Sequence, residues 1–193
     1  MNLPNKISLA RIALIPVFIA LYYLTVIPHN FLYATIVFAV AAFTDFLDGY
    51  IARKYNLVTD LVTDLGKFLD PIADKVLVLT AMILMLTPIA GGLLPAISGG
   101  IGVTVILARE LIVSSFRMVA ASKKVVIAAD KLGKIKTVSQ DIALVLILFS
   151  KAFVGSAFDI VWAVGYFLFI FSVIMTLISG INYILKNKAV FTE

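Results

Sequence analysis

Four aspartates lie in apolar surroundings and are the residues best suited to chemistry in this chain: Asp45, Asp48, Asp70 and Asp74. An ionised carboxylate is costly in hydrocarbon, so each should be paired, bound to a metal or set in a polar cavity. On a helix, Asp45 and Asp48 share one face because they are three residues apart, and Asp70 and Asp74 because they are four apart. Two such faces brought together would form an oxygen-rich site for hard divalent cations, with at most one carboxylate left for proton transfer.

Two arginines inside another apolar stretch indicate an anion site. Arg109 and Arg117 are eight residues apart, so they fall near one helix face about two turns from each other. Their forked donors suit phosphate, and Lys134 and Lys136 are placed to complete the site. Metals beside a phosphate site at a membrane surface favour phosphoryl-type transfer on a lipid. Alternatively, the arginines neutralise the aspartates or Glu110 or reach toward the interface, and Lys134 contacts lipid headgroups.

The composition indicates an integral membrane protein. The 193 residues are 62% hydrophobic and 14% charged, which is too apolar for a soluble domain. We expect one domain over residues 1–193. There is no cysteine, which excludes disulfides and thiolate metal sites. The net charge of +5 lies in short segments between apolar spans, so membrane lipid is the expected partner and nucleic acid is not.

The apolar runs predict an all-α fold of six transmembrane helices, preceded by a short amphipathic segment that Pro4 separates from the first span. The spans expected from the sequence cover about 12–27, 31–52, 68–86, 101–121, 138–149 and 160–185. The first aspartate pair then ends the second span and the second pair begins the third, on one side of the membrane. Every Lys and Arg except Lys151 falls on the side of the termini, which makes that side cytoplasmic.

The two aspartate blocks resemble a family signature. Asp-x2-Asp-Gly-x2-Ala-Arg ending at Arg53, then Gly-x3-Asp-x3-Asp starting at Gly66, is similar to the motif of the CDP-alcohol phosphatidyltransferases. These are six-helix membrane enzymes that displace CMP from a CDP-linked lipid or alcohol. Further stretches resemble the branch that joins CDP-diacylglycerol to glycerol 3-phosphate: Asn2-Leu-Pro-Asn5, Arg11, Ile15-Pro16, Ala108-Arg109-Glu110, Arg117, Val126-Ile-Ala-Ala129 and Gly133-Lys134-Ile-Lys136-Thr137. The resemblance covers nearly the whole chain and implies phospholipid biosynthesis at the bacterial cytoplasmic (inner) membrane, with the active site facing the cytoplasm.

The resemblance also implies a metal site. Asp45, Asp48 and Asp70 match ligands of two divalent cations, Mg²⁺ or Mn²⁺. Asp74 matches the residue that either reaches the second metal or acts as the catalytic base.

The substrate positions follow by the same resemblance. Those that match the site for the CDP moiety are Asp48, Gly49, Ala52, Arg53, Gly66 and Asp70. Arg109, Arg117 and Lys134 match the pocket for the phosphate of the acceptor alcohol.

A homodimer is also expected, and the small residues from Gly92 to Gly102 are a candidate contact surface.

One departure from the motif lies between its two blocks. Twelve residues separate Arg53 from Gly66 where the family has eight, and the excess is a tandem repeat, Leu57-Val-Thr-Asp60 and Leu61-Val-Thr-Asp64. A helical insert would rotate the following face by about 40° and advance it by about 6 Å, whereas a loop insert would bulge. Three further readings of the chain stay open: a sister enzyme that uses inositol phosphate or serine, a cation transporter that uses the aspartates, and an inactive member of the family.

Overall fold

The computed structural model describes residues 3–54, 64–88, 92–123 and 131–187, with side chains except at 3–8, 45–54, 64–71, 73 and 74. The described residues form six helices and no strand. The helices are α1 (Leu3–Tyr23), α2 (Asn30–Lys54), α3 (Asp64–Leu86), α4 (Ala96–Ser122), α5 (Lys131–Ser150) and α6 (Ser156–Lys186). The all-α prediction is therefore confirmed.

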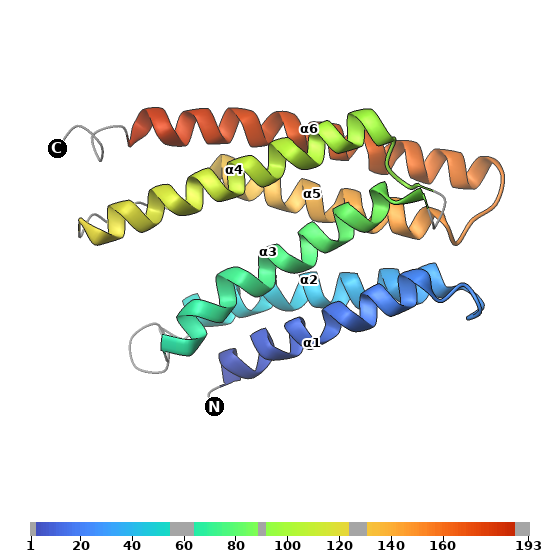
Figure 1. The fold of residues 1–193 in the computed structure, drawn as a ribbon, viewed down its shortest axis with the longest axis horizontal. Helices are drawn as coiled ribbons and strands as arrows, with labels where there is room; N and C mark the ends of the chain where they lie inside the picture. The colour runs from blue at the N-terminus through green and yellow to red at the C-terminus, as the bar shows by residue number, and fades with distance from the viewer. Residues whose placement is uncertain (1–2, 55–63, 89–91, 124–130, 188–193) are drawn as a thin grey trace.

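Successive helices run in opposite directions, so both ends of the chain lie at one end of the bundle (Figure 1). We call this the terminal end; α2, α4 and α6 finish there, and α1, α3 and α5 start there. The turns after α1, α3 and α5 lie at the opposite end. This arrangement places the C-terminal part of α2 and the start of α3 at the same end of the bundle, as the order of the predicted spans requires.

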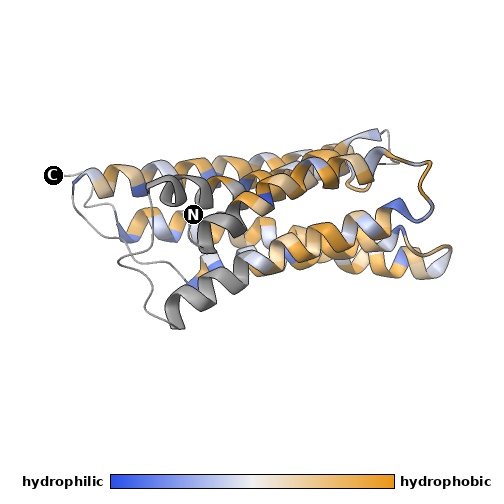
Figure 2. Cartoon of the chain, turned by 90° about the horizontal axis from the view of Figure 1, so that it is seen from below, coloured by the Kyte–Doolittle hydropathy of each residue, from blue (hydrophilic) through white to orange (hydrophobic). Residues whose placement is uncertain are grey.

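Apolar residues cover most of the helical surface. Among the described residues, α4 and α6 are long and apolar enough to cross a membrane, and shorter apolar helical stretches cover Leu9–Tyr23, Asn30–Thr44 and Lys75–Leu86. Figure 2 shows hydrophobic residues along the helices and hydrophilic residues mainly toward their ends. This pattern is consistent with a membrane protein.

Helix α1 begins earlier than the sequence suggested. It runs unbroken from Leu3, so the prediction of a separate amphipathic segment before the first span is wrong. Pro4 lies in the first turn, where a backbone N–H has no intrahelical acceptor, and the missing donor therefore costs little there.

Helix α5 also begins earlier, at Lys131 rather than near residue 138. Its buried positions include Lys136, Gln140, Ala143 and Ile147, which recur every three or four residues. This period belongs to one helix face, so a lysine assigned to a polar loop instead faces the protein interior.

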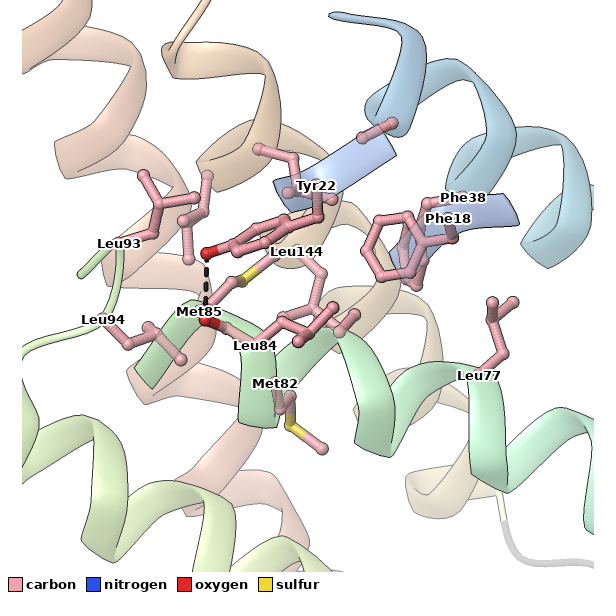
Figure 3. Packing of buried hydrophobic residues seen from close by; sticks show 14 of the residues in the cluster. Phe18, Tyr22, Phe38, Leu77, Met82, Leu84, Met85, Leu93, Leu94 and Leu144 are labelled. Carbon is pink, nitrogen blue, oxygen red and sulfur yellow. Dashed lines mark hydrogen bonds between the residues drawn. The ribbon is translucent and has the colours of Figure 1, made fainter. Parts of the chain in front are cut away.

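The hydrophobic core joins α1, α2, α3 and α5. Phe18 of α1 packs against Phe38 of α2, with ring centroids 5.8 Å apart. Leu77 of α3 and Leu144 of α5 lie in the same buried cluster (Figure 3). Helix α1 therefore packs against both α2 and α3, and this packing holds the end of α2 and the start of α3 at the same end of the bundle.

Close packing of α4 on α6 depends on a small residue. A Cβ on Gly102 would lie 2.8 Å from the ring of Phe169, closer than real contacts allow. Gly99 likewise packs against Leu94 and Leu86 of its own chain. The helix contacts expected for the small residues between Gly92 and Gly102 thus occur within one chain, and the homodimer stays a prediction.

Candidate active site

The four motif aspartates belong to two helices, one of which ends and the other begins at the terminal end of the bundle (Figure 1). Asp45 and Asp48 lie in the C-terminal part of α2, and Asp70 and Asp74 in the N-terminal part of α3. The side chains of these aspartates lie outside the described part of the structure, so the metal site stays a prediction.

The expected nucleotide contacts stay predictions for the same reason. The structure gives only the helical backbone at the positions concerned: Gly49, Ala52, Arg53 and Gly66. The tandem repeat falls largely in residues 55–63, which are outside the description. Among the side chains that are described, no group of three or more His, Asp or Glu residues could hold a metal ion.

A single carboxylate on α4, that of Glu110, lies close to cations from three helices. Glu110 Oε1 lies 3.0 Å from Arg109 Nη1 of α4 and 2.9 Å from Lys136 Nζ of α5, and Glu110 Oε2 lies 3.9 Å from Lys75 Nζ of α3. Lys75 Nζ also donates a hydrogen bond to Ser114 Oγ. Among the described side chains, three cations surround Glu110 and one more carboxylate, Asp141 of α5, lines the adjoining cavity, so the cations remain in excess and favour an anion.

The cluster is largely removed from water. The Lys136 side chain is 4% exposed and that of Glu110 is 19% exposed. Ion pairs removed from water in this way depend on good geometry and on additional hydrogen bonds. One interpretation of Arg109 is that it neutralises Glu110, and this ion pair is present in the structure.

A small polar cavity borders the cluster. It has a volume of about 40 Å³ and is lined by polar and apolar residues of α3, α4 and α5, the charged and amide side chains being Lys75, Glu110, Lys136, Gln140 and Asp141. Gln140 is 3% exposed, and its Oε1 has no hydrogen-bond partner within the described residues. A space of this size with polar walls is large enough for ordered water.

The Arg109 guanidinium is held by a second helix as well. Its Nη2 lies 3.3 Å from Ser179 Oγ of α6, and its aliphatic stem packs on Gly180, where a Cβ would be 3.1 Å from Arg109 Cγ. Gly133, at the start of α5, faces the same guanidinium, since a Cβ there would lie 3.4 Å from Nη2. The absence of side chains on these glycines leaves room around the charged group.

Arg117 is anchored two turns further along α4. Its Nε donates to the Tyr183 hydroxyl of α6 at 3.2 Å, and its guanidinium carbon lies 5.5 Å from the centroid of the same ring. Phe116 packs edge-on against Tyr183 at 5.7 Å and fixes the ring. The structure thus places Arg109 and Arg117 along one α4–α6 interface, as their spacing predicts.

Lys134 lies exposed in the first turns of α5, next to Gly133 and therefore near Arg109. This position fits either a phosphate ligand or a headgroup contact, and both interpretations of Lys134 stay open.

Sequence reasoning gave no role to α6, yet α6 supplies Ser179 and Tyr183 to the two arginines. The signal was available: buried small or polar residues recur along this otherwise apolar helix at Ser172, Thr176, Ser179, Gly180 and Tyr183. Their spacing marks one helix face turned toward neighbouring helices.

This combination of a helical membrane fold and a cationic site beside two aspartate-bearing helix ends agrees with the sequence comparison. The chain belongs to the CDP-alcohol phosphatidyltransferase family, whose model matches residues 1–179. This is a family of phosphotransferases that generally depend on divalent metal ions.

Individual relatives narrow the class. The chain is 41% identical to CDP-diacylglycerol--glycerol-3-phosphate 3-phosphatidyltransferase of Bacillus subtilis, over 96% of this chain and 95% of that protein. It is 40% identical to the Rickettsia bellii protein of the same name, over 98% and 97%. The Shigella flexneri protein of that name is 36% identical, over 97% and 96%.

Proposed function

We propose that this protein transfers the phosphatidyl group of CDP-diacylglycerol to glycerol 3-phosphate, giving phosphatidylglycerophosphate and CMP. The observation that carries the proposal is the cationic α4 site, which contains Arg109, Arg117 and the positive excess around Glu110. An acceptor that brings its own phosphate explains these charges, whereas serine, which has none, leaves them without a ligand. The names of the relatives supply the identity of the alcohol.

The proposed architecture is a single domain of six transmembrane helices in the bacterial inner membrane. The terminal end faces the cytoplasm, because Lys151 alone among the lysines and arginines belongs to the opposite end. The active site is then open to glycerol 3-phosphate and releases CMP into the same compartment.

The donor set fits divalent cations, because aspartate oxygens are the ligands that Mg²⁺ and Mn²⁺ prefer. Asp45, Asp48 and Asp70 would hold the two ions, and Asp74 would reach the second ion or act as base. When bound, the ions supply positive charge against the pyrophosphate of the donor lipid.

The remaining steps belong to the protein's side chains. Asp48, Gly49, Ala52, Arg53, Gly66 and Asp70 bind the CDP moiety. Arg109, Arg117 and Lys134 hold the acceptor phosphate and so orient its 1-hydroxyl. Asp74 takes the proton of this hydroxyl as its oxygen attacks the lipid-linked phosphorus and the bond to CMP breaks.

A lipid-product assay tests the proposal. Purified protein in detergent receives CDP-diacylglycerol and glycerol 3-phosphate with Mg²⁺, Mn²⁺ or EDTA, and CMP and lipid are measured. We expect metal-dependent release of CMP together with phosphatidylglycerophosphate. Turnover only with inositol phosphate or serine would keep the family and change the acceptor.

Two further experiments distinguish this transferase from a cation transporter and from an inactive member of the family. Metal flux into proteoliposomes without a lipid product would favour a transporter. Absence of turnover that is repaired by deleting residues 60–63 would locate the defect in the tandem repeat.

A further inference from the structure

The orientation of the Arg109 guanidinium is fixed from two sides. Glu110 Oε1 accepts from Nη1 at 3.0 Å, and Ser179 Oγ lies 3.3 Å from Nη2. The third donor, Nε, is buried and has no hydrogen-bond partner within the described residues. Nε packs against α6, since a Cβ on Gly180 would lie 4.0 Å from it, and the 15% of the side chain that stays exposed is the part that a ligand can reach.

Glu110 is itself held in place by residues outside α4. Lys136 Nζ donates to Oε1 at 2.9 Å, and Lys75 Nζ is 3.9 Å from Oε2. The carboxylate therefore cannot rotate away from Arg109 without losing contacts with α3 and α5. A free carboxylate at this place would repel a phosphate, but here its charge is shared among three cations.

We propose that Glu110 is a positioning residue for Arg109, and that it holds the guanidinium in the orientation in which its exposed part binds the anionic oxygens of the acceptor. Glu110 acts through Arg109 and does not touch the substrate. Ser179 makes the second, weaker contact of the same kind. The inference rests on the proposed function, in which Arg109 binds the phosphate of glycerol 3-phosphate.

A purely structural ion cluster makes a different prediction. Its loss would destabilise the bundle and lower kcat, or would weaken the binding of both substrates together. A positioning role instead changes the affinity for the acceptor and leaves the affinity for CDP-diacylglycerol as it was.

The test compares Glu110→Gln and Ser179→Ala with the full-length wild type in detergent. The KM and kcat for each substrate are measured, together with the Kd of glycerol 3-phosphate by isothermal titration. In Glu110→Gln we expect the KM and Kd for glycerol 3-phosphate to rise roughly tenfold, the size expected for a hydrogen bond to a charged group. In Ser179→Ala the rise should be about two- to threefold, as for a neutral donor–acceptor contact. The KM for CDP-diacylglycerol should not change.

Ser172→Ala is the matched control. Ser172 lies on the same helix and is fully buried, but its hydroxyl donates to the Phe169 carbonyl instead of contacting an arginine. We expect its KM values to equal those of the wild type.

Three results would overturn the assignment: an unchanged KM for glycerol 3-phosphate in Glu110→Gln, an equal rise for both substrates, or Ser179→Ala matching Ser172→Ala. If Glu110→Gln does not fold, the proposal is tested by comparing Ser179→Ala with Ser172→Ala alone. A wild type that forms no phosphatidylglycerophosphate, but binds glycerol 3-phosphate more tightly than Glu110→Gln does, would refute the proposed function and leave the role of Glu110 standing.

Discussion

The two ends of the bundle use polar side chains in different ways. At the opposite end, neutral donors bind main-chain carbonyls. The Tyr22 hydroxyl donates to the Leu84 carbonyl at 2.9 Å (Figure 3), and Trp162 Nε1 donates to the Leu93 carbonyl at 2.8 Å. Asn30 Nδ2 binds carbonyls in the last turn of α1. The Tyr22 and Asn30 contacts join neighbouring helices, and the Trp162 contact joins α6 to the turn between α3 and α4.

From the middle of the bundle toward the terminal end, ionised side chains bind one another or other side chains. Glu110 contacts Arg109 and Lys136, and Arg117 binds the Tyr183 hydroxyl. Positive charge is in excess there, and Arg109 Nε is not used by the described residues.

This difference separates contacts that stabilise the fold from charged groups that are available to bind a ligand. Where a neutral donor binds a backbone carbonyl, the contact stabilises the fold and offers nothing to a ligand. Where charged donors exceed their described acceptors, an anion would supply the missing acceptor, as we propose for the acceptor phosphate. Substitutions at the terminal end should therefore change kinetic constants, and substitutions at the opposite end should change the melting temperature.

The largest effect is expected for Asp74→Asn at the terminal end. The amide cannot accept the hydroxyl proton, so kcat should fall by about 10²- to 10⁴-fold. CMP release is the measurement. Asp159→Asn, in the first turn of α6 at the opposite end, is the control and should retain wild-type turnover. Equal loss in both variants would contradict the contrast between the ends.

Arg117→Lys should have the next largest effect. Lysine keeps the charge but loses the forked donors and the Nε contact to Tyr183, so the KM for glycerol 3-phosphate should rise about tenfold. Initial rates at varied acceptor concentration give this constant. Lys151→Arg at the opposite end should leave it unchanged, and a rise there would show that the acceptor site is not confined to the terminal end.

Tyr22→Phe should show the reverse pattern. The substitution removes one hydrogen bond to the Leu84 carbonyl, which still accepts from the Thr87 N–H and hydroxyl, so it costs about 0.5 to 1.5 kcal/mol of folding free energy. Thermal unfolding in detergent should show a lower melting temperature, with both KM values unchanged. Tyr33→Phe, at a position 47% exposed, should leave the melting temperature as it is. A changed KM in Tyr22→Phe would mean that the two ends are coupled.

Gly133→Ala should have the smallest effect. The added methyl would lie 3.4 Å from Arg109 Nη2, and by crowding the guanidinium it should raise the KM for glycerol 3-phosphate roughly threefold, less than 1 kcal/mol. Stability should not fall, since alanine favours a helix over glycine. Gly100→Ala, with nothing within 4 Å of the new Cβ, is the control. An unchanged KM would show that no ligand approaches the guanidinium from the side of α5.

The sequence by itself determined the helices, the family and the common end of the two aspartate pairs. Apolar runs of sufficient length predict helices whatever their neighbours are, and a short connection places the end of α2 and the start of α3 at the same end of the bundle. The spacing of Arg109 and Arg117 likewise predicted a shared helix face, because that face follows from the helical period alone. From sequence alone the basic residues at the start of α5 indicate a loop, and this prediction is wrong because the helix already begins at Lys131.

Only the tertiary structure decided which groups meet across helices. Arg109 and Ser179 are separated by 70 residues, and Arg117 and Tyr183 by 66. Lys136 could have faced lipid headgroups, but the rotation of α5 in the core turns it toward Glu110. A helical period fixes which residues share a face, whereas the direction of that face and its partner depend on how all six helices pack, and no local pattern contains this information.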